Sequence, residues 1–101
     1  MKVIMKLCDM IEEEIEDAYK YAQCAMEFKS TDKPMAEMFF RLSQGELEHM
    51  TTLHKQVVDK IEKARKENEP PAYMLEFYNY LHAKHIDRTK EVKILQEMFE
   101  S

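Results

Sequence analysis

Apolar side chains recur at intervals of three and four residues along nearly the whole chain, which is the spacing of one face of an α-helix. Two short stretches break this pattern. Residues 29–34 (KSTDKP) offer three side-chain oxygens for a helix N-cap just before a proline, and residues 67–72 (ENEPPA) contain Pro70 and Pro71. The pattern predicts a single all-α domain over residues 1–101, with helices at about 2–29, 34–67 and 71–99.

The apolar stripe of the first expected helix is interrupted by one carboxylate. Read at alternating steps of four and three, this stripe consists of Leu7, Ile11, Glu14, Ala18, Tyr21, Ala25 and Phe28. The corresponding stripe of the second helix consists of Met35, Phe39, Leu42, Glu46, His49, Leu53 and Val57. Glu14, Glu46 and His49 therefore occupy positions where aliphatic side chains are expected.

These three polar side chains are expected at one level of a helical hairpin. If the first two helices run antiparallel with a turn near residues 31–32, Glu14 and His49 are equally far from that turn, and Glu46 lies within about one helical turn. Because an unpaired buried carboxylate is strongly disfavoured, two of them beside an imidazole need a cation or protons. Carboxylate oxygens with an imidazole nitrogen suit iron, manganese or zinc better than calcium or magnesium.

The interrupted stripes are also compatible with two further hypotheses. Buried polar groups can set the register of packed helices, so the chain could be a non-catalytic helical dimerisation or interaction module with a polar seam. A metal site could also be mononuclear and lie within one chain, with His85 of the third helix as an additional ligand.

A single chain supplies half of a dinuclear site. Di-iron carboxylate bundles take a Glu from each of two helices and a Glu-x-x-His pair from each of the other two. Here the first helix offers Glu14, the second offers Glu46 and His49, and the third has no further copy of either in register. A symmetric homodimer, or a higher homo-oligomer, would complete the set by packing two hairpins face to face. Such a dimer would hold two metal ions, most simply iron.

The spacing of these residues resembles that of a known family. Tyr21 follows Glu14 by seven residues, and the ELEH motif at 46–49 begins about 30 residues after Glu14. In this respect residues 7–57 resemble the rubrerythrin-type form of the ferritin-like superfamily, especially half-length members such as encapsulated ferritins. The resemblance implies a ferritin-like four-helix bundle formed by two hairpins, and an oxidoreductase that oxidises Fe(II) with oxygen or peroxide. It also implies Tyr21 near the metals and metal ligands at Glu14, Glu46 and His49.

Gly45 and three further histidines are the remaining candidates. Gly45, the only glycine, weakens a helix interior, and we expect its missing side chain to let a helix or carboxylate approach closely beside the metals. The third helix carries an apolar stripe with a His-x-x-His pair, His82 and His85, and His54 falls near both if the second corner turns near residue 69. These histidines are candidates for a second metal site or, as is more common, partly exposed residues of an amphipathic helix.

Composition and charge narrow the setting of the protein. The net charge of −5 argues against nucleic acid or an anionic membrane as a partner, because both attract basic surfaces. No apolar stretch approaches the ~20 residues of a membrane span. Cys8 and Cys24 lie 16 residues apart on one helix, too far to bridge each other, so no disulfide is expected. Reduced thiols and an acidic N-terminal segment without a signal-peptide pattern favour a cytoplasmic location.

Overall fold

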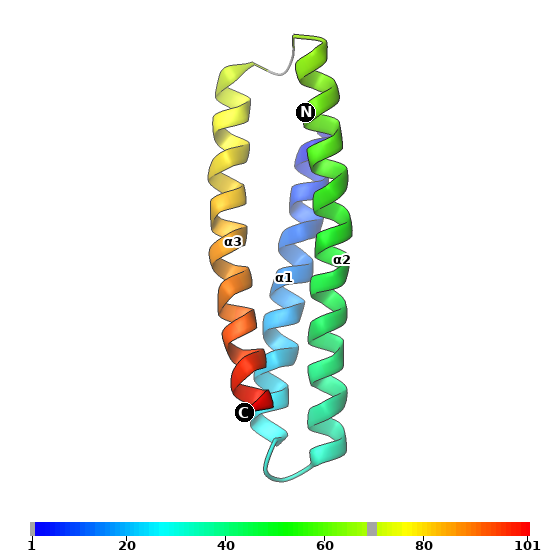
Figure 1. The fold of residues 1–101 in the computed structure, drawn as a ribbon, viewed down its shortest axis with the longest axis vertical. Helices are drawn as coiled ribbons and strands as arrows, with labels where there is room; N and C mark the ends of the chain where they lie inside the picture. Colours follow the sequence, from blue (N-terminus) through cyan, green and yellow to red (C-terminus); the bar gives the residue numbers. More distant parts are fainter. Residues whose placement is uncertain (1, 69–70) are drawn as a thin grey trace.

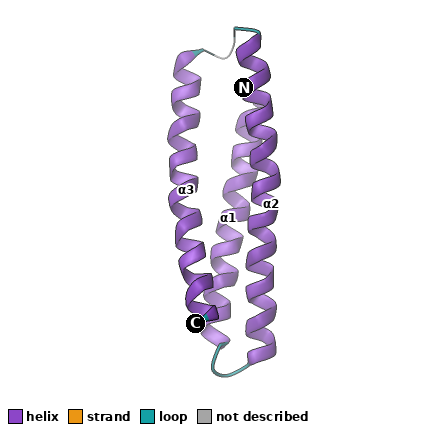
Figure 2. Cartoon of the chain, viewed as in Figure 1, coloured by secondary structure: helices purple, strands orange, loops and turns teal. Residues whose placement is uncertain are grey.

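The chain folds into three long helices. The computed structural model describes residues 2–68 and 71–101, and these form α1 (Lys2–Phe28), α2 (Lys33–Lys66) and α3 (Ala72–Glu100) (Figure 1). Within the described ranges there is no strand (Figure 2), which confirms the all-α prediction. Where a helix end differs from its expected position, it does so by one residue.

The helices lie side by side in an elongated bundle of 56 × 18 × 17 Å. α1 and α2 form an antiparallel hairpin, and α3 turns back to run in the direction of α1 (Figure 1). α3 packs mainly against α1 and touches α2 only sparsely. One side of the hairpin is therefore covered by a third helix of the same chain.

Both corners use local hydrogen bonds to end one helix and start the next. At the first corner the carboxylate of Asp32, one of the three N-cap candidates, accepts a hydrogen bond from the amide of Met35 at 3.2 Å. At the second corner Asn68 adopts the left-handed conformation with φ of 60°, which asparagine tolerates better than most residues. Pro70 lies outside the described residues, and Pro71 directly precedes α3.

Aliphatic side chains from all three helices meet in one core. Its buried members are Ile4, Cys8, Ile11, Ile15, Ala18, Val57, Ile61 and Val92. Burying one large aliphatic side chain stabilises a fold by ~1.5–3 kcal/mol, so this shared cluster holds α3 against the hairpin. Toward the first corner the buried residues are small, and they include the alanines Ala22, Ala25 and Ala36 of α1 and α2.

Both cysteines lie on α1. Cys8 is buried and Cys24 half-buried, and both are free thiols. Across the described residues, no helix combines the length and the apolar character that crossing a bilayer requires.

Candidate metal centre

Glu14 from α1 meets Glu46 and His49 from α2 at mid-height of the hairpin. Each of the three offers one ligand atom, and these atoms all lie within 4.8 Å of one another. Nδ1 of His49 lies 3.4 Å from Oε2 of Glu14 and 3.9 Å from Oε2 of Glu46. Among the described residues, this is the only group of three or more such side chains close enough to share a metal ion.

Local geometry and one buried hydrogen-bond chain bring the three side chains together. Glu46 and His49 are three residues apart, so they project from the same face of α2. The hydroxyl of Ser43, fully buried, donates to the carbonyl of Ala18 at 2.7 Å and accepts a hydrogen bond from Nε2 of Gln96 at 2.9 Å. Ser43 precedes Glu46 by three residues and Ala18 follows Glu14 by four, so this chain of hydrogen bonds fixes the register of the two ligand-bearing helices.

The cluster lies on the side of the hairpin that faces away from α3. Glu12 of α1 lines a small cavity together with α3, and Thr51 of α2 lines a larger one. Helical residues two positions apart point in roughly opposite directions, so Glu14 and His49 point away from α3. The side chain of His49 is 65% exposed, whereas those of Glu14 and Glu46 are 26% and 19% exposed. The two carboxylates are therefore mostly covered, and the imidazole borders solvent.

The two carboxylates have few hydrogen-bond partners within the chain and lie close to each other. Oε2 of Glu14 is buried and has no hydrogen-bond partner among the described residues. The pKa of the Glu46 carboxyl is raised to about 7, first because it shares a proton in a hydrogen bond with Glu14. Burial and the negative charge of Glu14 raise this pKa further, while His49 acts in the opposite direction. A cation between the two carboxylates would offset the same negative charge that protonation of Glu46 offsets.

The residues present fit a transition-metal ion. Two carboxylates and one imidazole are hard and borderline donors that suit iron, manganese or zinc. A cation bound here would give the buried oxygen of Glu14 a partner. It would also offset the negative charge that contributes to the raised pKa of Glu46. We call the group formed by Glu14, Glu46 and His49 the half-site.

Tyr21 lies on the same stripe as Glu14 but forms an aromatic stack. Its ring lies 6.2 Å from that of Phe39, which in turn lies 6.2 Å from Phe28. Its hydroxyl forms no hydrogen bond to any of the three half-site residues. Within one chain, then, the ring of Tyr21 packs among aromatic side chains about two helical turns from Glu14.

Gly45 faces open space. A Cβ added at this position would meet nothing within 4 Å, so no described helix or carboxylate of the same chain approaches closely there.

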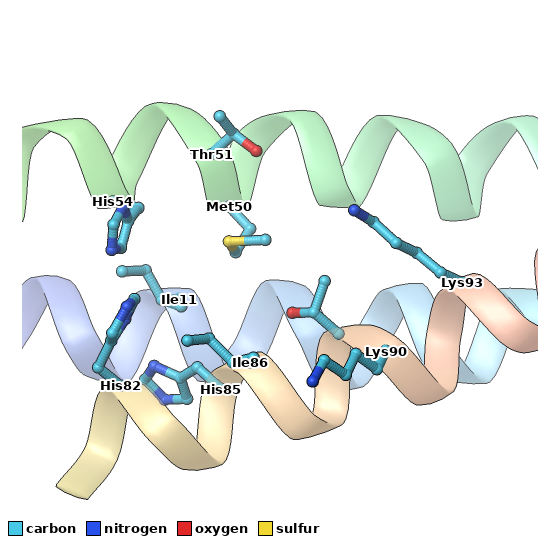
Figure 3. Close-up of a pocket in the computed structure, with 10 residues that line it drawn as sticks. Ile11, Met50, Thr51, His54, His82, His85, Ile86, Lys90 and Lys93 are labelled. Atoms are coloured by element: carbon cyan, nitrogen blue, oxygen red, sulfur yellow. The ribbon is translucent and has the colours of Figure 1, made fainter. Parts of the chain in front are cut away.

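The other three histidines line a cavity between α2 and α3 and do not form a ligand set. The rings of His54 and His82 stack with centroids 4.7 Å apart, and Tyr78 stacks on His82 at 5.7 Å. Figure 3 shows these two histidines and His85 at one end of the cavity. His85 faces α1 and α2 from the α3 side, so it does not join the half-site.

Two contributors to the site were not identified from the spacing of the sequence. Asp17 is exposed, and its negative charge adds to the rise in the pKa of Glu46. Its position three residues after Glu14, on a neighbouring part of the same helix face, is the signal that points to it. Ser43 is the second, and the signal there is a small polar residue one turn before a ligand.

Comparison of the chain with protein-family models, with curated proteins and with solved structures finds no match in any of the three. The resemblance to the ferritin-like superfamily therefore stays a prediction that rests on residues of this chain alone.

Proposed function

We propose that this protein binds two metal ions, most simply iron, at a site shared by two copies of the chain, and that it oxidises Fe(II) or reacts with oxygen or peroxide there. The observation that carries the proposal is the half-site, in which three donor side chains converge and a buried oxygen of Glu14 has no hydrogen-bond partner among the described residues. A purely structural polar cluster would satisfy its own hydrogen bonds. In the half-site, Oε2 of Glu14 is buried without a hydrogen-bond partner among the described residues.

The proposal of a homodimer rests on what surrounds the half-site. Met10 precedes Glu14 by one turn and Leu42 precedes Glu46 by one turn, so both flank the ligands. They are 40% and 41% exposed, which is unfavourable for side chains of this size. Three donors also leave a transition-metal ion with open coordination positions. A second copy related by a two-fold axis would bring the same three donors and cover the same apolar side chains.

Each residue of the site has a defined task in this proposal. Glu14 and Glu46 would bind the metals and offset their charge, and His49 would be a neutral ligand through a ring nitrogen. Met10 and Leu42 would exclude water once two copies meet. The metals, when bound, would supply the redox chemistry with oxygen or peroxide. Manganese or zinc would fit the same donors, and zinc would bring no redox chemistry.

A second candidate function is a non-catalytic dimerisation module. It is favoured by the same exposed side chains, Met10 and Leu42, because they need a partner whether or not a metal is bound. In that case the half-site would set the register of the two copies and would not bind metal.

The experiment is native mass spectrometry of the chain loaded with Fe(II) without oxygen, compared with the Glu46→Gln variant. We expect a dimer with two metal ions for the unaltered chain and a loss of metal affinity of about 100-fold or more for the variant. Glu48→Gln is the matched control, since it removes the same charge from an exposed position in the same turn. After addition of oxygen, we expect the unaltered chain and the Glu48→Gln control to form Fe(III), and the Glu46→Gln variant to form much less.

Each alternative gives a different result. Iron binding by Glu46→Gln at the level of the Glu48→Gln control would overturn the metal-binding proposal. A dimer without metal affinity would support the interaction module. A monomer with one metal ion would support a mononuclear site.

The position of the dimer interface can be tested with two matched charge insertions. Leu42 and Phe77 are 41% and 48% exposed, but Leu42 flanks the half-site and Phe77 lies on α3. We expect Leu42→Lys to produce monomers in sedimentation velocity and Phe77→Lys to leave the dimer unchanged. The reverse result would place the interface on α3 and exclude a shared half-site.

A further inference from the structure

The cavity between α2 and α3 is separate from the half-site and has the dimensions of a ligand pocket. Its volume is about 330 Å³, within the range of ~300–1,000 Å³ that is typical of small-molecule sites. It exists because α3 packs on α1 and leaves α2 largely uncovered along this stretch. Figure 3 shows side chains from all three helices around it.

The middle of this cavity is lined by aliphatic side chains. Ile11 from α1, Met50 from α2 and Ile86 from α3 lie along its middle (Figure 3). His82 at one end and Lys93 at the other are separated by eleven residues of α3, which corresponds to about 16 Å of helix. An elongated cavity of this length suits an extended chain better than a compact ring.

The charges around the cavity are of one sign. Lys90 and Lys93 lie toward the end opposite the histidines, and Lys93 extends from α3 toward α2 (Figure 3). Neither lysine forms an ion pair with a described residue. Within the part of the chain that the structure describes, no carboxylate lines the cavity, although the chain as a whole carries a net charge of −5. Two such ammonium groups beside an apolar wall select an anion with an apolar body.

The histidine end supplies little charge. Burial and the neighbouring His82 lower the pKa of His54, and burial is also the main cause that lowers the pKa of His85. Both shifts favour the neutral form of the imidazole. Glu12 lines an adjoining small cavity together with His85, where Lys84 and Arg88 also lie. Among the side chains that line the main cavity, the two lysines therefore mark the end that favours an anion.

We propose that this cavity binds a medium-chain aliphatic carboxylate. The carboxylate group pairs with Lys90 and Lys93, and the hydrocarbon chain lies along Ile11, Met50 and Ile86 toward the stacked histidines. The site opens to solvent beside Ile86, which is 42% exposed, so the ligand can enter without opening the bundle. The inference is independent of the proposed metal chemistry, because the half-site lies on the other side of the hairpin.

The test is titration of the metal-free protein with decanoate below its micelle concentration, followed by calorimetry and by NMR chemical shifts. We expect saturable binding with shift changes at Ile11, Met50 and Ile86. The double variant Lys90→Gln/Lys93→Gln should weaken binding by about tenfold or more, as loss of charge-assisted hydrogen bonds predicts. Lys55→Gln, an exposed position on α2 outside the cavity, should not change it. Ile86→Trp should block binding by filling the opening.

Further ligands and variants separate this proposal from its competitors. Acetate tests the carboxylate without the chain, and decyltrimethylammonium tests the chain with the opposite charge; both should bind much more weakly. Equal binding of the cationic amphiphile would overturn the proposal, since it would show adsorption without selection of charge. Shift changes in the cavity that depend on protein concentration and not on decanoate would also overturn it, because a second copy would then occupy the groove. The Glu46→Gln variant should bind decanoate normally, which keeps this result apart from that of the metal test.

Discussion

The two sides of the α1–α2 hairpin differ in how far their side chains are buried. One side packs on α3, and the other carries the half-site. On the covered side Ile15 and Val57 are 1% and 0% exposed and belong to a core shared by all three helices. On the open side Leu42 is 41% exposed and the side chain of His49 is 65% exposed. The same two helices thus present one face completed within the chain and one face whose ligands and apolar residues border solvent. α3 therefore completes the packing of one face of the hairpin and leaves the ligand-bearing face accessible to solvent.

The largest expected effect comes from removing a side chain on the covered face. Ile15→Ala should lower the free energy of unfolding by about 3 kcal/mol, because a buried aliphatic side chain is replaced by a cavity. Leu42→Ala should change it by less than about 0.5 kcal/mol in dilute, metal-free protein, because Leu42 is half in solvent. Urea unfolding of both variants measures the contrast. Equal losses for the two variants would show that the open face is part of the folding core of the single chain.

An intermediate effect is expected from the shared proton of the half-site. The folded-state pKa of Glu46 is about 7 and its ordinary value is 4.5, so the folded protein binds this proton more tightly than the unfolded chain. The stabilisation is complete below pH 4.5 and is lost as the pH rises through about 7. Gln does not titrate, so the metal-free Glu46→Gln variant does not lose this stabilisation as the pH rises. We therefore expect it to be more stable than the unaltered chain by roughly 1–2 kcal/mol at pH 8. The gain should disappear near pH 4.5.

Thermal unfolding between pH 4.5 and pH 8, with Glu48→Gln as the control, measures this difference. A Glu46→Gln variant that is less stable than the unaltered chain at pH 8 would mean that the carboxylate serves the fold. Metal binding should depend on pH in the opposite direction, since a metal ion must displace the same proton and is bound more tightly as the pH rises.

The smallest expected effect is at Gly45. Gly45→Ala should stabilise the metal-free single chain by roughly 0.5–1 kcal/mol, because alanine favours a helix and the added methyl group meets open space. If a second copy packs over the open face, the same substitution should weaken the dimer while stabilising the monomer. Urea unfolding and sedimentation velocity report the two effects separately. Unchanged dimerisation would place Gly45 outside the interface.

Much of the candidate site follows from local rules. Glu14, Glu46 and His49 interrupt apolar stripes of regular spacing, and the short corner capped by Asp32 sets their distances from the turn. The structure brings them to one level of the hairpin, as that spacing predicts. The surroundings of Gly45 and the arrangement of His54, His82 and His85 did not follow in the same way. Whether a glycine faces a neighbour, or whether histidines stack or converge on one point, depends on helix rotation by a few tens of degrees.

The sequence by itself determined the three helices, their corners and the placement of two carboxylates and an imidazole within apolar stripes. These features depend on the helical period, on capping and on the backbone limits of proline, which act over a few residues. Only the tertiary structure decided that α3 covers the side opposite the half-site, that an oxygen of Glu14 is left without a partner among the described residues, and that a cavity with two lysines opens between α2 and α3. Those outcomes come from the packing of many weak contacts between distant segments, which no short pattern in the chain encodes.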